Sequence, residues 1–416
     1  MAVASPPGKR AVSVPPSDVP LQALCSAGDR VAAPRRICVV GSGTRFLSGI
    51  SYYTHHLAVA LAQVQPVSVV LMRQLLPTRL YPGRKRVGAK LTRLDYGAVP
   101  VCDGVDWFWI PSILRAAAFL IRQRPQVLIL QWWTGTVFHS YLALAMIARL
   151  RGARIVIEFH EVLDSGEVRI KIANAYAGVL GKLLVRLAHG FVVHSEHDRP
   201  LLAQHYDLGC RPTAVIQHGP YDQYRLAENA RPRRDAPASA CNLLFFGTIR
   251  PYKGLEDLVA AFDGFSEHEI DRFWLTIVGE TWEDWTLPSD SIASSRYRSR
   301  ITFVNRYVTD KEAAAYLAGA DAVVLPYHRS SASGPLHVAM SLGLPVVTTP
   351  VGGLAEAVAG YEGAILFQPG NTSALRDALV QVACLGQGRF ADSHCWEQTA
   401  IEYGALFDAV SPRAGR

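Results

Sequence analysis

The segment PYHRSSASGPLHVAMSLGLPVVTTPVGG, residues 326–353, decides the fold of its half of the chain. The apolar residues just before it predict a strand, and residues 344–349 predict the next one, each bounded by turn residues. Between them, Ser333 or Gly334 can cap a helix that begins with Pro335, whose missing N–H costs nothing at that position. A helix that begins behind a loop of small residues presents free backbone N–H groups and its positive dipole end to an anion. We therefore expect a phosphate to bind at this helix N-terminus.

The same alternation of strands and helices occurs twice along the 416 residues, which are too many for one core. The expected strands are residues 36–40, 68–72, 127–130, 154–159, 191–193 and 214–216 in the first half and 242–246, 274–278, 301–303, 322–325, 344–349 and 364–367 in the second. The fold class is therefore α/β, with two doubly wound Rossmann-like domains facing across a cleft. The expected parts are a disordered leader at 1–34, an acceptor-side domain at 35–225, a Pro-rich linker at 226–240, a nucleotide-sugar-binding domain at 241–394, and a helix at 395–416 that crosses back to the first domain.

The net charge of +7 is modest, but it is unevenly distributed. Between residues 79 and 93 there are six basic side chains and no acid, with apolar residues among them: Arg79, Arg84, Lys85, Arg86, Lys90 and Arg93. One interpretation is a solvated surface loop. The other is a surface for anionic lipid headgroups or an anionic acceptor, because clustered basic residues beside apolar side chains favour such a partner. Nucleic acid is not expected, since no recognition motif accompanies the charge.

Several features bear on the compartment. The seven cysteines are scattered and form no Cys-x-x-Cys pair, which favours reduced thiols in a cytosol over a disulfide framework or a zinc site. The leader is rich in Pro, Ala and Ser and lacks the apolar core of a signal peptide. Polar residues interrupt the apolar segment 127–148, which predicts a buried strand and a helix instead of a membrane span. We expect a cytoplasmic protein, at most peripheral on the inner face of the cell membrane.

The first strand ends in a glycine-containing loop, Gly-Ser-Gly at 41–43, with a further glycine at Gly49. The third glycine of a dinucleotide-binding fingerprint is absent, so the motif is weak, and a tight strand-to-helix turn explains it equally well. We favour a loop that approaches a donor phosphate through Gly43 and Gly49. Arg45 and Ser51, from the same loop and the helix after it, are candidate acceptor contacts.

Residues 158–161, Glu-Phe-His-Glu, directly follow the apolar residues 155–157 of the expected strand. His160 and Glu161 therefore lie at the carboxyl end of the strand and can face the cleft. A single histidine is most often structural, but this position favours His160 as a catalytic residue and Glu161 as an acceptor contact. A zinc site would need a second histidine or carboxylate at helical spacing nearby, and none is evident.

The loop at 248–254, Thr-Ile-Arg-Pro-Tyr-Lys-Gly, follows the first strand of the second half. Arg250 and Lys253 can project over a diphosphate and neutralise the charge that develops on a leaving nucleotide. A solvated charged loop is the alternative, but two cations beside Pro and Gly at a strand end make it the weaker one. Thr248 of the same loop is a candidate donor contact.

Other strand ends supply further candidates. Gly279 and Arg306 follow two strands of the second half and are expected to line a pocket for the nucleotide base. Trp132 and Trp133 follow the strand 127–130 and are candidate acceptor contacts, because their rings can stack on a sugar or a lipid headgroup. Packing in the core is the more common role for at least one of the two.

Together these segments resemble the retaining GT-B glycosyltransferases of family 4, over residues 36–407. The most specific similarities are residues 246–254, which look like the family's basic donor-phosphate loop, residues 334–345, which look like its nucleotide-binding helix, and residues 351–356, which resemble the "VGG…E" turn. In the first half, the loop 41–49, His160, the pair His194-Ser195 and the pair His218-Gly219 resemble segments that line the family's cleft. The resemblance implies donor contacts at Gly43, Gly49, Thr248, Gly279, Arg306, Ser330, Ser333, Gly334, Pro335, Leu336, Val338 and Glu356.

The sequence departs from the family at two places. The family's arginine commonly sits where Thr248 stands, with Arg250 two positions on, and a motif of two glutamates is altered. The family carries two glutamates eight residues apart, which contact the donor sugar and the ribose. Alignment on Ala339-Met340 puts these positions at Ser330 and Val338, and neither is a carboxylate. Serine hydroxyls and the amides of Gly334 and Leu336 can replace some of the hydrogen bonds, but not the ribose carboxylate contact.

The resemblance implies transfer of a sugar from a nucleotide-sugar to an acceptor hydroxyl with retention of the anomeric configuration. The leaving diphosphate would deprotonate the acceptor, with Arg250 and Lys253 stabilising the charge. No cofactor and no metal are expected, because the chain contains no Asp-x-Asp motif. The expected partners are a nucleotide-diphosphate-sugar and an acceptor, with a lipid-linked acceptor favoured over a soluble one.

Three other classes stay open at this point. A nucleotide-sugar epimerase of the same fold would use Glu161 and Glu280 as acid and base. A non-catalytic nucleotide-sugar binder would explain Ser330 and Val338. An NAD-dependent oxidoreductase is the weakest of the three, because the second strand does not end in an acidic residue.

Overall fold

The computed structural model describes residues 34–43, 49–74, 94–106, 108–161, 171–225, 230–281, 285–386 and 388–411. Met1–Pro34 forms a unit of its own, and the fold described below is that of the second unit, Arg35–Arg416. The expected leader, the candidate Arg45 and the basic stretch at 79–93 lie outside the described residues.

The first sheet has seven parallel strands in the order β3-β2-β1-β4-β5-β6-β7. They are β1 (Ile37–Ser42), β2 (Val67–Gln74), β3 (Val101–Asp106), β4 (Val127–Trp132), β5 (Arg154–Phe159), β6 (Gly190–Val193) and β7 (Thr213–Val215). The central strands are continuous apolar runs, and every residue of β1 and β4 is buried. Strands of this kind need helices on both faces of the sheet.

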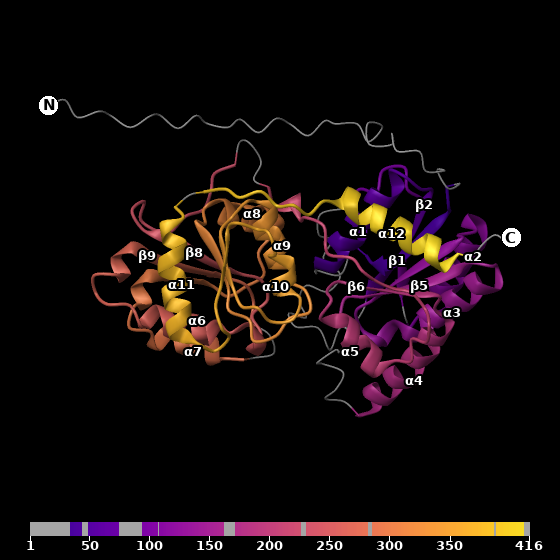
Figure 1. Ribbon diagram of the computed structural model, residues 1–416, viewed down its shortest axis with the longest axis horizontal. Coiled ribbons are helices and arrows are strands. Elements are labelled where there is room, and N and C mark those ends of the chain that lie inside the picture. The colour runs from indigo at the N-terminus through magenta and orange to yellow at the C-terminus, as the bar shows by residue number, and fades with distance from the viewer. Residues whose placement is uncertain are drawn as a thin grey trace. The chain divides into compact units, whose positions relative to one another are not determined.

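Helices cover both faces of the first sheet (Figure 1). On one face, α1 (Gly49–Ala62) packs against α12 (Trp396–Val410), the last helix of the chain. The other face is covered by α2 (Ile110–Gln123), α3 (Phe138–Leu150) and α4 (Lys171–Leu187), and α5 (Asp198–His205) follows β6. The helix α12 therefore packs on the sheet that contains β1, and Arg35, just before β1, pairs with Asp408 of α12 at 2.6 Å.

The second sheet has six parallel strands in the order β10-β9-β8-β11-β12-β13. They are β8 (Cys241–Phe246), β9 (Phe273–Val278), β10 (Ile301–Val304), β11 (Ala322–Leu325), β12 (Val346–Thr348) and β13 (Ala364–Leu366). Its helices are α6 (Leu255–Asp263), α7 (Leu287–Ser294), α8 (Asp310–Ala318), α9 (Gly334–Ser341), α10 (Leu354–Ala357) and α11 (Thr372–Cys384). The expected α/β class with two doubly wound parallel sheets is confirmed.

The strand order reverses at one place in each sheet, between β1 and β4 and between β8 and β11. Ligands of open α/β sheets bind outside the carboxyl ends of the strands at such reversals. The loops after β8 and β11 are the basic loop and the small-residue loop singled out in the sequence. The topology therefore brings these two loops to the same edge of the second sheet.

Most expected strands end within about two residues of the observed ones, but the sequence missed β3. β3 reads Val-Cys-Asp-Gly-Val-Asp, which lacks an apolar run because it is an edge strand paired only to β2 within the described residues. In the part of the chain that the structure describes, no helix has the length and hydrophobicity to cross a bilayer.

Candidate active site

The loop after β8 is held against the end of β11 by its glycines. Gly254 has a φ of 62°, and a Cβ atom there would lie 2.1 Å from the carbonyl oxygen of Pro326. The His328 N–H donates to the Tyr252 carbonyl at 2.8 Å, which joins the two loops directly. The short 3-10 turn Pro251–Lys253 ends at Gly254, so the position of this glycine fixes where the Lys253 side chain starts.

The helix α9 begins beside this loop. The Ser333 hydroxyl accepts a hydrogen bond from the Leu336 N–H, and Pro335 occupies the first turn, as expected from the sequence. A Cβ atom on Gly247 would lie 3.1 Å from the Pro335 ring and 3.5 Å from the Lys253 ammonium nitrogen, so these three residues lie together. A buried cation and a helix N-terminus are thus adjacent, an arrangement that attracts a phosphate.

Two cavities meet at the start of α9. The larger, of about 600 Å³, contains Arg250 in its wall, and the smaller, of about 230 Å³, contains Lys253. Gly334 and Pro335 line both, as does Gly49 from the first half of the chain. The expectation that Arg250 and Lys253 lie beside Gly334 therefore holds, with one cation on each side of the helix start.

Lys253 is a buried ammonium whose described surroundings provide no carboxylate partner. Burial, and after it the neighbouring charge of Arg250, lowers the pKa of Lys253 to about 7. Its nitrogen lies 5.0 Å from the centroid of the Tyr327 ring, a cation–π contact that compensates only part of the lost hydration. An anion placed beside it would restore the ordinary charge, so the site favours a phosphate on electrostatic grounds.

The smaller cavity contains several residues that the sequence predicted to contact the donor. Its wall contains Thr248, Gly279, Arg306 and Val338 of the predicted donor set, together with Ser51, which the sequence had suggested for the acceptor. Arg306 is held by a two-pronged pair with Glu312, whose shorter contact is 2.6 Å. The cavity also contains residues that the sequence did not suggest: Tyr52, Gln223, Tyr224 and Tyr307.

The larger cavity collects the candidates from the first half of the chain. His160, Glu161 and Trp133 line it, opposite Arg250 and the small-residue loop at Ser330. His160 is 8% exposed, so one edge of its ring reaches the cavity while the rest is buried. This cavity can hold a sugar next to a diphosphate at the start of α9.

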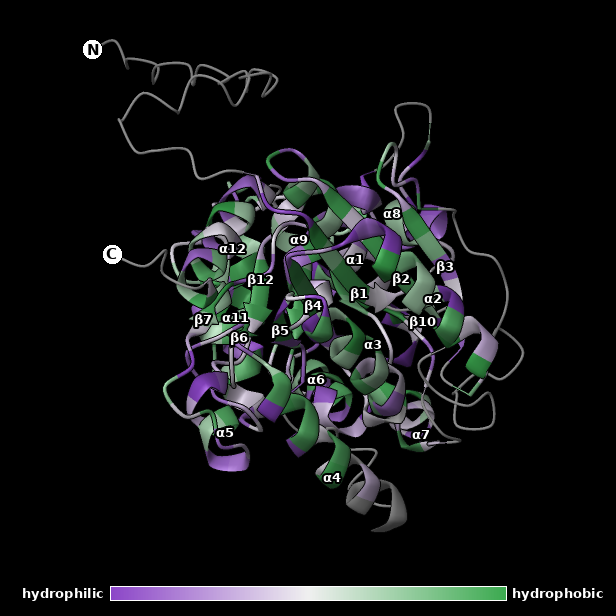
Figure 2. Ribbon diagram, turned by 90° about the vertical axis from the view of Figure 1, so that its right-hand side faces the viewer, coloured by the Kyte–Doolittle hydropathy of each residue, from purple (hydrophilic) through white to green (hydrophobic). Residues whose placement is uncertain are grey.

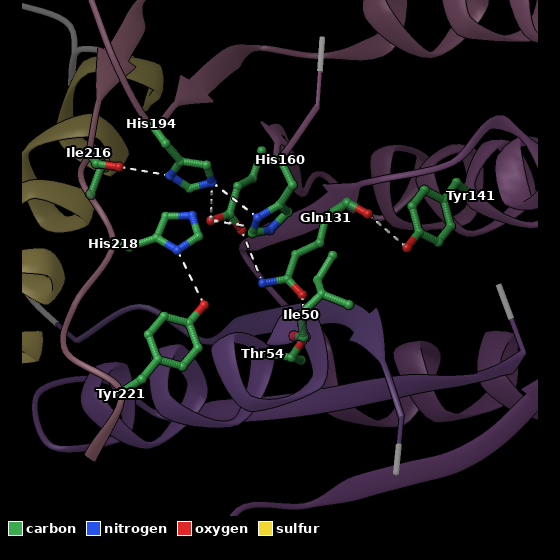
Figure 3. A network of polar contacts seen from close by, with 10 residues as sticks. Ile50, Thr54, Gln131, Tyr141, His160, His194, Ile216, His218 and Tyr221 are labelled. Atoms are coloured by element: carbon green, nitrogen blue, oxygen red, sulfur yellow. Dashed lines mark hydrogen bonds and ion pairs between the residues drawn. The ribbon is translucent and has the colours of Figure 1, made fainter. Parts of the chain in front are cut away.

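His160 belongs to a buried polar network (Figure 3). The Nδ1 of His194 lies 2.8 Å from the carbonyl of Ile216, which can only accept, so Nδ1 carries the proton. The Nε2 of His194 is then an acceptor for the Nδ1–H of His160 at 3.2 Å. These two bonds fix the orientation of the His160 ring, and burial keeps the ring neutral by lowering its pKa well below the usual range.

A carboxylate lies at the centre of this network. Glu158 of β5 is completely buried, and the side-chain amide of Gln131 donates to it at 3.1 Å. Burial raises the pKa of Glu158 to about 7, against the smaller opposing effects of Tyr53, Tyr403 and Gln131. The sequence analysis assigned Glu158 no role, since its neighbour Tyr403 on α12 cannot be found from local spacing.

The same histidines could also hold a metal ion. His160, His194 and His218 are all buried, and one ligand nitrogen of each lies within 4.8 Å of the others. The sequence analysis considered ligands at helical spacing only, whereas the other two imidazoles come from the ends of neighbouring strands.

Glu356 lies elsewhere than the sequence suggested. It lines neither cavity, and its carboxylate accepts hydrogen bonds from the backbone N–H groups of Glu196 at 2.6 Å and His197 at 3.0 Å. A Cβ atom on Gly353 would lie 2.8 Å from the Ser195 side chain, so the whole turn contacts the start of α5. Glu356 therefore bridges the two halves of the chain in this structure.

Four other expected contacts do not line either cavity. Trp132 packs in the core, with its ring centroid 4.0 Å from that of Phe138, and so is corrected from acceptor contact to core residue. Gly43 is buried, and a Cβ atom there would lie 2.8 Å from the Met72 carbonyl, which supports the tight-turn interpretation. Leu336 is fully buried, and Ser333 acts as the cap of α9.

Comparison with known proteins agrees with this geometry. Residues 240–384 match the family model described as glycosyl transferases group 1. This segment contains the basic loop, the start of α9 and both cations.

Similar proteins include glycogen synthase of Mycobacterium tuberculosis, which is 25% identical over 374 residues, spanning 86% of this chain and 79% of that protein. The GDP-mannose:glycolipid 4-beta-D-mannosyltransferase of Xanthomonas campestris is 37% identical over 107 residues, 25% of this chain and 29% of its own length. Among solved structures, sucrose-phosphate synthase from Thermosynechococcus elongatus superposes with a TM-score of 0.61 at 18% identity, covering 90% of this chain and 98% of that one. The structural likeness shows the GT-B fold, and the sequence matches support a glycosyltransferase with a nucleotide-sugar donor.

Proposed function

We propose that this protein transfers a sugar from a nucleotide-diphosphate-sugar to an acceptor hydroxyl with retention of the anomeric configuration. The observation that carries the proposal is the junction of the two cavities at Gly334 and Pro335, with Lys253 on one side and Arg250 on the other. The nucleotide occupies the smaller cavity, the sugar occupies the larger one, and the diphosphate lies at the start of α9 between them.

The reaction follows from where charge develops. The bond between the anomeric carbon and the diphosphate oxygen breaks, and a bond from the acceptor oxygen forms on the same face of the sugar. The acceptor's proton passes to the departing diphosphate oxygen. Arg250, Lys253 and the N–H groups of α9 stabilise the negative charge on the diphosphate, which needs no metal ion in this scheme. His160 positions the sugar at the edge of the larger cavity.

The missing ribose glutamate has a candidate replacement. Val338 lines the smaller cavity where the family resemblance implies a carboxylate, and Glu280 is the carboxylate among the described residues of that cavity wall. We assign the ribose hydroxyls to Glu280. The Glu280→Gln variant tests this assignment, with a weaker nucleotide affinity expected and an unchanged melting temperature without ligand.

The geometry is less favourable to the other classes. An epimerase needs its acid and base at one carbon atom, but Glu161 lines the larger cavity and Glu280 the smaller one. An oxidoreductase would place Gly43 against a dinucleotide, whereas Gly43 lines neither cavity. A binder without activity keeps the same cavities, so it is separated from a transferase by product formation alone.

The acceptor is proposed to be lipid-linked and presented at the cytoplasmic face of a membrane. The support is the local similarity to an enzyme whose name specifies a glycolipid acceptor. Trp133 and Glu161, in the wall of the larger cavity, are the described candidates for its contacts.

The test begins with a thermal-shift screen of nucleotide-sugars, because a ligand that binds the folded state raises the melting temperature. The hit is then incubated with candidate acceptors, and the anomeric configuration of the product is read by NMR. Retained configuration, with the same rate after treatment with a chelator, supports the proposal. Inversion, or a rate that a chelator abolishes and a divalent cation restores, contradicts it. Epimerised donor in the absence of acceptor would identify the rival enzyme class.

A further inference from the structure

The outer face of α2 exposes an apolar stripe. Ile110, Leu114, Ala118 and Ile121 recur at intervals of four, four and three residues, which places them on one side of the helix, and all four are exposed. The opposite side of the helix is buried against the sheet. Phe108 and Trp109, just before the helix, are 58% and 56% exposed. Water-facing residues of a surface helix are ordinarily polar, so this stripe is unusual.

The two neighbouring helices continue the exposed apolar surface. α3 packs against both α2 and α4 on the same face of the first sheet. Met146 and Leu150 of α3 are 48% and 86% exposed, and Val179 and Leu183 of α4 are 62% and 38% exposed. Figure 2 shows hydrophobic stretches along α3 and α4. Most of the large exposed apolar side chains in the described part of the chain lie on these three helices or directly before α2.

The charge of this surface has one sign. None of the three helices contains Asp or Glu. Among the side chains of these helices that the structure describes, the exposed basic ones are Arg115, Arg122, Arg149, Lys182 and Arg186. Proteins that keep a surface helix in water mix both signs, whereas apolar side chains bordered only by cations are typical of helices that lie in the interface of an anionic bilayer. Trp109 is of the residue type that is enriched at that depth.

We propose that the surface formed by α2, α3 and α4, with Phe108 and Trp109, docks on an anionic lipid bilayer. The apolar side chains enter the headgroup region, and the arginines and lysines contact lipid phosphates. Helices of a parallel α/β sheet begin at the carboxyl ends of the strands, so Trp109 lies at the edge of the sheet where the larger cavity opens. The proposal does not rest on the chemistry of transfer, since the helices and the cavities are separate surfaces.

The experiment is flotation of the full-length protein with vesicles of phosphatidylcholine containing a third phosphatidylglycerol, and with vesicles of phosphatidylcholine alone. The test variant is Leu114→Glu combined with Leu183→Glu. The matched control is Ile401→Glu, which changes an exposed apolar residue on α12, on the other face of the sheet. Far-UV circular dichroism and the melting temperature establish that each variant is folded.

We expect wild type and Ile401→Glu to float with the anionic vesicles, and to do so more weakly at high salt. The partition coefficient of the double variant should be lower than that of wild type by about tenfold or more. Bilayer contact by Trp109 predicts a blue shift of tryptophan emission with vesicles that is reduced in Trp109→Phe. Failure of wild type to bind anionic vesicles overturns the proposal, as does equal loss in Ile401→Glu. A dimer in solution that the double variant dissociates, without vesicle binding, would show that a second copy covers this face. Because no readout is enzymatic, its failure leaves the proposed transfer untouched.

Discussion

The Lys253 ammonium, in the loop after β8, lies 5.0 Å from the centre of the Tyr327 ring, in the loop after β11. These loops flank the strand reversal of the second sheet, so the fold itself determines that the cation meets the start of α9. Lys253 is buried, and no carboxylate among the described residues pairs with it. Without a ligand, its positive charge is therefore not compensated. A diphosphate would complete it.

Replacement of Lys253 by Ala should lower kcat/KM. The expected loss of transition-state stabilisation is about 2–4 kcal/mol, because the variant lacks a desolvated charge next to the leaving group. The melting temperature should not fall, since a buried cation costs stability when no anion is bound. Steady-state kinetics with donor and acceptor make the measurement, and the exposed Lys311→Ala on α8 is the matched control. Turnover equal to that of wild type would remove Lys253 from the mechanism.

The depressed pKa of Lys253 predicts a specific pH dependence of stability. The ordinary value is 10.5 and the folded value is about 7, so between these pH values the unfolded chain binds a proton that the folded protein lacks. The contribution of Lys253 to the free energy of unfolding therefore rises with pH between these two values, by up to ~1.4 kcal/mol per pH unit. The difference in the free energy of unfolding between wild type and Lys253→Met should widen in favour of wild type from pH 7.5 to pH 9. Denaturant titrations of both proteins check this, and a constant difference would contradict the buried, depressed state of the lysine.

Glu356 should act on stability and not on donor affinity. Its replacement by Ala leaves the N–H groups of Glu196 and His197 without their acceptor, which should lower the free energy of unfolding by about 1–2 kcal/mol. Glu356→Gln keeps one acceptor oxygen and should cost less, and the exposed Glu362→Ala should cost nothing measurable. Urea denaturation and nucleotide titration separate the two effects. A large loss of nucleotide affinity at unchanged stability would restore the donor contact that the sequence suggested.

The sequence predicted those parts of the fold that local pattern determines. Apolar strands such as β5 and β8 and the cap at Ser333 follow from neighbouring residues, and they lie where expected. β3 could not be found in this way, because its stability comes from pairing with β2 and not from its own apolar content.

Part of the site could be predicted from one rule, namely that the carboxyl ends of parallel strands lie at the same edge of a sheet. This rule brought Arg250, Lys253 and Gly334 together correctly. It failed for Trp132, because a residue at a strand end can face the core as well as a ligand. Glu356 was suggested by the family resemblance and not by this rule, and its carboxylate contacts the other half of the chain. The histidine network and the Glu158 carboxylate needed tertiary structure, since their partners come from separate strands and helices.

The most direct test of the central claim compares a nucleoside diphosphate with its monophosphate by isothermal titration calorimetry, using the base that the thermal-shift screen selects. If Lys253 lies beside the second phosphate, wild type should bind the diphosphate at least about tenfold more tightly than the monophosphate. Lys253→Ala should bring the two affinities close together while leaving the monophosphate affinity within about twofold of wild type. Equal affinities in wild type, or a preference that survives in Lys253→Ala, would contradict the account.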